Sequence, residues 1–201
     1  MPTLPASSPG ERYTGTAITL HWLIALLLLG QFAFGLLLGD IPRGTPARGM
    51  YVNLHKSTGI LIGLPILLRI GWRLTHAPPP LALTMPSWQR FAARTNHLML
   101  YVCMLLMPLS GYLGSNFSRY GIKFFNVIFF PPWGPDDKTW YTLFNRTHHV
   151  TALVLAAFVL LHLLAVAKHV LIDRDGLLLR MWPVPRRGGA RPASALSPET
   201  R

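Results

Sequence analysis

The chain has 201 residues, of which 51% are hydrophobic and only 13% charged, and its formal net charge is +12. Ordinary soluble domains carry about 25% charged residues, so the composition excludes that class. The basic residues gather at the edges of apolar runs, which excludes nucleic-acid binding as the reason for the positive charge. The single cysteine, Cys103, excludes an internal disulfide, and no C-x-x-C-H motif for thioether attachment of a cofactor occurs.

Four apolar stretches follow one another along the chain. Three of them lack Asp, Glu, Lys and Arg over a length that can cross a bilayer as a helix, about 20 residues: 17–39, 95–118 and 147–167. The fourth, 52–74, carries Lys56 and Arg69 near its edges, where long cationic side chains reach the headgroups. The first stretch is too long for a signal peptide and is expected to remain as an anchor. We therefore predict an all-α integral membrane protein, an up-down bundle of four helices.

The apolar stretches define one membrane domain, 16–183, between two tails. The tails, 1–15 and 184–201, are rich in Pro, Ser, Gly or Arg and are expected to be disordered. Three connections are expected near 40–51, 75–94 and 119–146, and the last should lie along the outer surface with Arg119 and Lys123 in water. Twelve of the nineteen Lys and Arg residues fall on the side of the two termini, which predicts that both termini are cytoplasmic.

Six of the eight histidines lie in or beside these stretches, and an ionisable side chain inside a membrane indicates a functional site. They are His21, His55, His97, His148, His149 and His162. His148 and His162 are 14 residues apart, which is about four helical turns and a rise of about 21 Å, so both face one side of the helix. Two histidines so far apart cannot bind one metal ion. They suit two sites, one near each face of the membrane.

Each site needs a second ligand from another helix at the same depth. With the amino terminus inside, His55 is level with His148 near the outer face, and His21 is level with His162 near the inner face. Two histidines facing each other in a helical bundle can hold a b-type haem through its iron, so we predict two haems. Zinc transport is the competing interpretation, but zinc sites favour acidic co-ligands, and the aspartates lie outside the apolar stretches.

Three other histidines have open roles. His149 is rotated by about 100° from His148 and could replace it as a ligand. His97 would begin the third span, where it would contact a haem propionate or cap the helix. His169 is seven residues beyond His162, on nearly the same helix face, and is either a candidate contact for a quinone carbonyl or an exposed interfacial residue.

Several short motifs together resemble the bacterial cytochrome b561 family over roughly residues 12–183. They are I-T-L-H-W at 18–22, N-L-H-K-S-T-G at 53–59, the arginine-rich exit ending at Leu74, the three prolines at 78–80, H-L-x-L-Y-x-x-x-L-x-x-P-L-S-G at 97–111 and H-x13-H at 148–162. The resemblance implies a bacterial inner-membrane protein with two b-type haems. It implies the same axial ligands as the helix register, namely His21, His55, His148 and His162.

The resemblance also implies an oxidoreductase, and it leaves two functions open. One type of member is a superoxide oxidase, which passes electrons from superoxide in the periplasm to ubiquinone in the membrane. In that case the outer cations Arg43, Arg48, Arg119 and Lys123 would attract the anion. The other type is a haem b subunit that relays electrons between a partner dehydrogenase or hydrogenase and quinone. The first is the leading prediction, with membrane lipid, quinone and superoxide or a redox protein as the expected partners.

Overall fold

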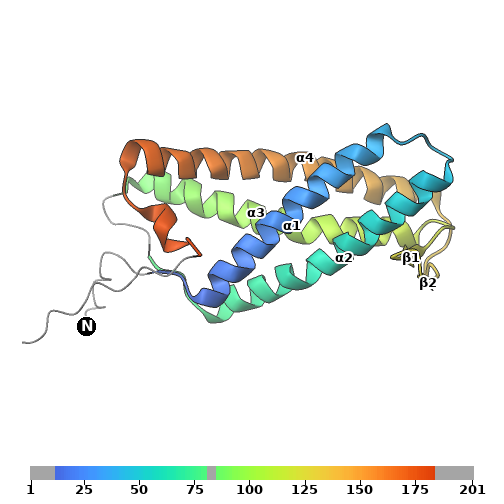
Figure 1. Cartoon of the computed structure of the whole chain (residues 1–201), viewed down its shortest axis with the longest axis horizontal. Coiled ribbons are helices and arrows are strands. Elements are labelled where there is room, and N and C mark those ends of the chain that lie inside the picture. The colour runs from blue at the N-terminus through green and yellow to red at the C-terminus, as the bar shows by residue number, and fades with distance from the viewer. Residues whose placement is uncertain (1–11, 81–84, 184–201) are drawn as a thin grey trace, which may run out of the picture.

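Four long helices run side by side in the structure, a computed structural model that describes residues 12–80 and 85–183 (Figure 1). They are α1 (Gly15–Asp40), α2 (Pro46–Thr75), α3 (Ser87–Asn116) and α4 (Lys138–Lys168). All four are long and apolar enough to cross a membrane, so the predicted all-α membrane bundle is confirmed. Most of the predicted amino-terminal tail and all of the predicted carboxyl-terminal tail lie outside the described residues.

Side chains cap the amino-terminal ends of three of the four helices. The hydroxyl of Thr14 accepts from the backbone N–H of Ala17 at the start of α1, and Thr45 does the same at the start of α2, where Pro46 occupies the first helical turn. The carboxylate of Asp137 accepts two backbone N–H groups at the start of α4. These caps satisfy amide groups that have no partner inside a helix.

The helices are longer than the charge-free stretches predicted, so the connections are shorter. α3 begins at Ser87 instead of near residue 95, and α4 begins at Lys138 instead of near residue 147. The added turns carry cationic side chains such as Arg90 and Arg94, which can stand at the membrane edge. One consequence is a correction for His97, which lies ten residues inside α3 and cannot cap it.

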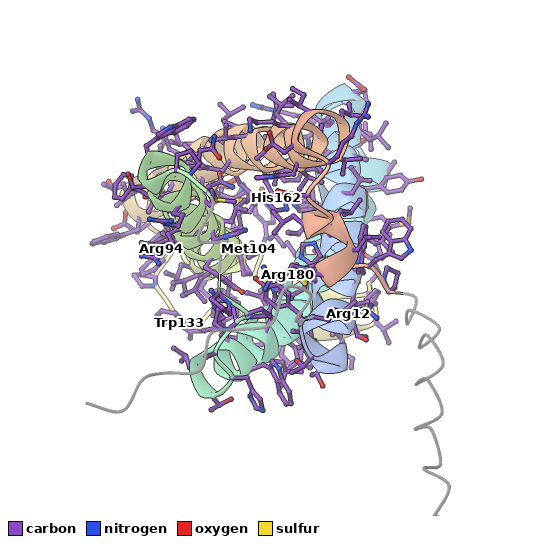
Figure 2. The ribbon with its side chains drawn as sticks, turned by 90° about the vertical axis from the view of Figure 1, so that its left-hand side faces the viewer. Arg12, Arg94, Met104, Trp133, His162 and Arg180 are labelled. Carbon is purple, nitrogen blue, oxygen red and sulfur yellow. The ribbon has the colours of Figure 1, made fainter. Side chains whose placement is uncertain are left out.

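The helices form a four-cornered bundle in which α1 packs on α2, α2 on α3 and α3 on α4. We call the end where α1 begins and α2 ends the inner end, which faces the viewer in Figure 2, and the opposite end the outer end. The buried hydrophobic core takes residues from all four helices: Ile24, Ile62, Ile66, Cys103, Met104 and Leu155. Leu155 is completely buried and lies seven residues from both His148 and His162. The dry core therefore separates the two predicted sites.

The connection between α3 and α4 forms a β-hairpin at the outer end (Figure 1). Strand β1 (Ile122–Phe124) pairs antiparallel with β2 (Ile128–Phe130). The expected surface segment is thus a folded hairpin, and two adjacent residues of α2 hold it by hydrogen bonds. Ser57 Oγ accepts from the N–H of Phe125 at 2.8 Å, and Lys56 Nζ donates to the carbonyl of Gly121 at 3.0 Å. Lys56 is therefore engaged with the hairpin instead of the headgroups.

Short helical turns after α4 fold back across the inner end. A π-helical turn, η1 (His169–Asp173), continues α4, and a 3-10 turn, η2 (Leu177–Arg180), follows it. The N–H of Tyr13 donates to the carbonyl of Arg180, and the indole of Trp22 donates to the carbonyl of Met181 at 2.8 Å. The two ends of the membrane domain are thereby joined beside the start of α1.

We expect Ser57→Ala to loosen the hairpin from α2. Ser57 is fully buried, and without its hydroxyl the N–H of Phe125, a residue with a left-handed backbone, loses its acceptor. The expected loss is about 1–2 kcal/mol of stability, seen as a lower midpoint of thermal unfolding in detergent. Ser115→Ala is the matched control, because within the described residues the buried Ser115 hydroxyl bonds only to a carbonyl of its own helix. Equal midpoints for the two variants would contradict this role for Ser57.

Candidate functional site

The outer histidine pair joins α2 to α4. The ring centres of His55 and His148 are 6.3 Å apart, and the ring planes are nearly perpendicular. Nδ1 of His148 lies 2.9 Å from the carbonyl oxygen of Met107. Because a carbonyl only accepts, this Nδ1 carries the proton, and Nε2 keeps the lone pair with which a histidine binds a metal. Nδ1 of His55 is buried without a hydrogen-bond partner in the described part of the chain.

The inner histidine pair joins α1 to α4. The ring centres of His21 and His162 are 6.2 Å apart, and in Figure 2 His162 lies near the axis of the bundle. A third histidine is present at this level, since the ring of His97 on α3 lies 5.6 Å from that of His162. The structure thus brings together both pairs expected from the register, and it adds His97 to the inner one.

The ring separations fit a shared metal ion. An imidazole nitrogen binds a transition metal at about 2 Å, and the nitrogen lies about 1 Å from the centre of its ring, so two opposed ligands place their ring centres about 6 Å apart. Both pairs match this separation. Along the continuous helix α4 the two levels are about 21 Å apart. The arrangement can therefore hold two metal centres at different depths.

Glycines allow other helices to approach the outer pair. A Cβ atom at Gly111 would stand 3.2 Å from Nδ1 of His148, and one at Gly35 would stand 3.5 Å from Cε1 of His55. Gln31 on α1 adds a polar link, because its side chain donates to the carbonyl of His55 and accepts from the hydroxyl of Thr58. The outer pair is therefore held by contacts from all four helices.

The predicted outer cations have different environments. Arg48 donates to the carbonyls of Leu38 and Ile41 at the end of α1, so it has a structural task. Arg119 is exposed and bonds to the hydroxyl of Tyr120, and this hydrogen bond raises the pKa of Arg119. Lys123 on β1 is exposed too. Of the predicted set, Arg43, Arg119 and Lys123 are exposed, and the last two lie at or beside the hairpin.

The remaining histidines lie outside the two pairs. The ring centres of His149 and His148 are 6.3 Å apart, but His149 is exposed on α4. His169 lies at the inner end, where its Nδ1 is 2.6 Å from Asp175 Oδ2 and 3.2 Å from Asp173 Oδ2. This histidine is thus oriented by carboxylates, and its contact with a quinone stays a prediction.

Arg69 belongs to the inner site, although the sequence predicted only that it lies at the membrane edge. Its guanidinium donates to the carbonyl of Ala17, one turn before His21, at 2.7 Å. Its charge acts on the rings of His21 and His162. A signal was present in the sequence: Arg69 follows His55 by 14 residues, the same spacing that separates His148 from His162, so it must lie at the inner level.

A four-helix membrane bundle with histidine pairs at two depths defines a class of protein that binds metal groups inside the bilayer. Comparison with known families gives the particular one. The model of the family described as prokaryotic cytochrome b561 matches residues 12–184, and the chain belongs to this family. Membership carries membrane electron transfer and a b-type haem with it, and the histidine geometry fits that cofactor.

Curated relatives cover nearly the whole chain. "Cytochrome b561 homolog 2" of Escherichia coli (strain K12) is 30% identical over 85% of this chain and 91% of its own length. "Cytochrome b561 homolog 1" of the same organism is 29% identical over 86% and 98%. "Probable superoxide oxidase CybB" of Yersinia pestis is 26% identical over 88% and 98%. The similarity thus extends over most of this chain and over nearly the full length of each relative.

We expect Gly111→Ala to disturb the outer pair. The added methyl group would press on the His148 ring from about 3.2 Å and weaken its bond to the carbonyl of Met107, at a cost of about 1–3 kcal/mol. The purified variant should bind less b-type haem, measured by the reduced-minus-oxidised absorption spectrum. Gly71→Ala is the control, since nothing lies within 4 Å of a Cβ there. A normal spectrum for Gly111→Ala would refute the close approach.

Proposed function

We propose that the chain carries two b-type haems and passes electrons between the two faces of the membrane. His55 and His148 would ligate the outer haem iron, and His21 and His162 the inner one. The observation that carries this proposal is the pair of ring separations, 6.3 Å and 6.2 Å, at two levels of one continuous helix. When bound, each haem supplies an iron that gains and loses one electron.

The protein side chains have defined tasks in this proposal. The carbonyl of Met107 holds the His148 ring with Nε2 available, which is the usual way a second partner orients a metal-binding histidine. The apolar core around Leu155 keeps water out of the space between the two levels. Ligand type and burial together tune the reduction potential of each site.

We propose superoxide as the donor at the outer end and ubiquinone as the acceptor. Two superoxide anions would each lose one electron and become O2, and one quinone would take up two electrons and two protons. Arg119 and Lys123 support the donor, because exposed cations beside the outer pair concentrate an anion by electrostatic focusing. The printed name of the Yersinia pestis relative, a probable superoxide oxidase, points the same way.

The acceptor and the orientation are parts of the same proposal. With both termini in the cytoplasm, as the Lys and Arg distribution predicts, the inner pair lies at the cytoplasmic side. His169 is our proposed quinone contact there, because two carboxylates engage its Nδ1 and the protonated ring then has its Nε2–H available to donate to a quinone carbonyl. The cytoplasm would supply the two protons.

Replacing one ligand in each pair should remove one haem at a time. His148→Ala should lose the outer haem and His162→Ala the inner one, because each change leaves an iron with a single axial histidine. Haem per chain is measured by the pyridine haemochrome assay, with His149→Ala as the control that keeps both haems. A full count of two haems in either ligand variant would mean that the pairing is wrong.

Superoxide should drive quinone reduction by the purified protein. We expect quinol formation when an enzymatic superoxide source and a soluble ubiquinone analogue are supplied, and only the uncatalysed background with His148→Ala. Lys123→Gln and Arg119→Gln should slow the reaction at low ionic strength and less so in salt, because salt screens exposed charges. A protein with two haems but no activity above background would instead favour the alternative, a subunit that relays electrons between a dehydrogenase or hydrogenase and quinone.

A further inference from the structure

A cavity of about 360 Å³ opens at the inner end between α1, α2 and the proline segment 78–80. Its walls reach from Arg12 near the inner surface to Tyr101, one turn beyond His97 along α3. Ala17, one turn before His21, is another wall residue. The cavity therefore extends from the inner surface to the level of the inner histidines.

The described walls of this cavity contain arginines and no acidic residue. Arg69 and Arg73 on α2 line it together with Arg12, and none of its described lining residues is acidic. Arg69 is half-buried inside a membrane helix and forms no ion pair within the described part of the chain. A cation at this depth is costly unless an anion or dipoles compensate it, and the one hydrogen bond from Arg69 that the structure describes goes to a neutral carbonyl.

The position of Arg69 follows from the helix register. It lies 14 residues, or about four turns, after His55, so α2 presents both residues on one face at the two levels. Arg73 follows one turn later, on the same face and closer to the inner surface. The charge of Arg69 acts on His21, His97 and His162, and that of Arg73 acts on His97. Both arginines thus stand beside the inner histidines.

We propose that Arg69 and Arg73 bind the two propionate carboxylates of the inner haem in this cavity. The inference rests on the proposed function, because it needs a haem at the inner pair. A haem brings two carboxylates into the membrane, and burying each of them is costly without a cationic partner. Burying the guanidinium of Arg69 is likewise costly without an anionic partner. Guanidinium groups match carboxylates with two parallel hydrogen bonds. The pairing compensates both kinds of charge and fixes the rotation of the haem in its plane.

The phosphate of a lipid headgroup has the same charge and could enter the same cavity. The two sources differ in what they affect. A carboxylate of the inner haem couples Arg69 to the reduction potential of that haem and to its retention, whereas a lipid phosphate couples it to the phosphorus content of the purified protein. The depth of Arg69, level with the histidines, favours the haem carboxylate.

The first test is a redox titration of Arg69→Gln and Arg73→Gln. Loss of a nearby positive charge makes the ferrous state less favourable, so the potential of the inner haem should fall while that of the outer haem stays constant. The two potentials are assigned from His148→Ala and His162→Ala. Arg69→Lys should keep most of the native potential, and Arg94→Gln, on the far side of the inner end from Arg12 (Figure 2) and outside the cavity lining, should keep all of it.

The second test measures transfer of haem to excess apomyoglobin. Arg69→Gln should release the inner haem on the order of tenfold faster, as expected for the loss of a hydrogen bond to a charged group. Unaltered protein reconstituted with haem whose propionates are esterified should release it at a similarly increased rate, and with that haem Arg69→Gln should add nothing further. The comparison of the two haems in unaltered protein can be made even if the variant binds haem poorly.

The results distinguish a failure of the proposed function from a failure of the proposed carboxylate site. Unaltered protein without an inner haem would refute the proposed function. An inner haem whose potential and release rate are unchanged in Arg69→Gln would overturn the carboxylate site alone. Loss of bound phospholipid phosphorus from Arg69→Gln, with both haem properties unchanged, would overturn it in favour of a lipid headgroup.

Discussion

The hydrocarbon core of a membrane offers no partner to a polar group, and this constraint orders the whole bundle. The polar side chains of the spans gather at two levels, where each can meet another. α4 supplies His148 and His162 with a 14-residue spacing, and α2 supplies His55 and Arg69 with the same spacing. Midway between the levels, these two helices place Ile62 and Leu155 in the buried hydrophobic core. The bundle is two polar layers held apart by one dry layer.

The segment around His55 shows how one short stretch serves several neighbours. Within one and a half turns, Lys56 and Ser57 hold the outer hairpin, while Thr58 and the carbonyl of His55 bond to Gln31 on α1. Gly59 lets α1 approach closely, since a Cβ there would stand 3.2 Å from Gln31 Nε2. The helix segment that carries His55 is thus held from two directions, by the hairpin and by α1, which explains the density of this motif.

The spans, the depth of each histidine and the pairing of His55 with His148 and His21 with His162 could be predicted, because helix periodicity and bilayer thickness leave little freedom. The helix ends could not, because the interface tolerates charges such as Arg90 and Lys138 that a charge-free window excludes. The hairpin was missed as well, since its support comes from Ser57 and Lys56, far away in sequence. The depth of Arg69 could be predicted from its 14-residue spacing from His55, but a search confined to histidines does not consider an arginine.

The two ends of the bundle differ in where their cationic side chains lie, and the difference fits the proposed electron transfer from the outer end to the inner end. At the outer end, Arg119 and Lys123 are exposed beside the hairpin, so a small anionic donor, as proposed, would reach that end with electrostatic help. At the inner end, the turns after α4 are tied to α1 through Tyr13 and Trp22, and the charges lie in a cavity. Exposed cations act on encounter, whereas cations in a cavity act on a group that stays bound. In the proposed function, cationic side chains would therefore attract the donor at one face and retain the haem at the other, and the histidine layers would connect the two.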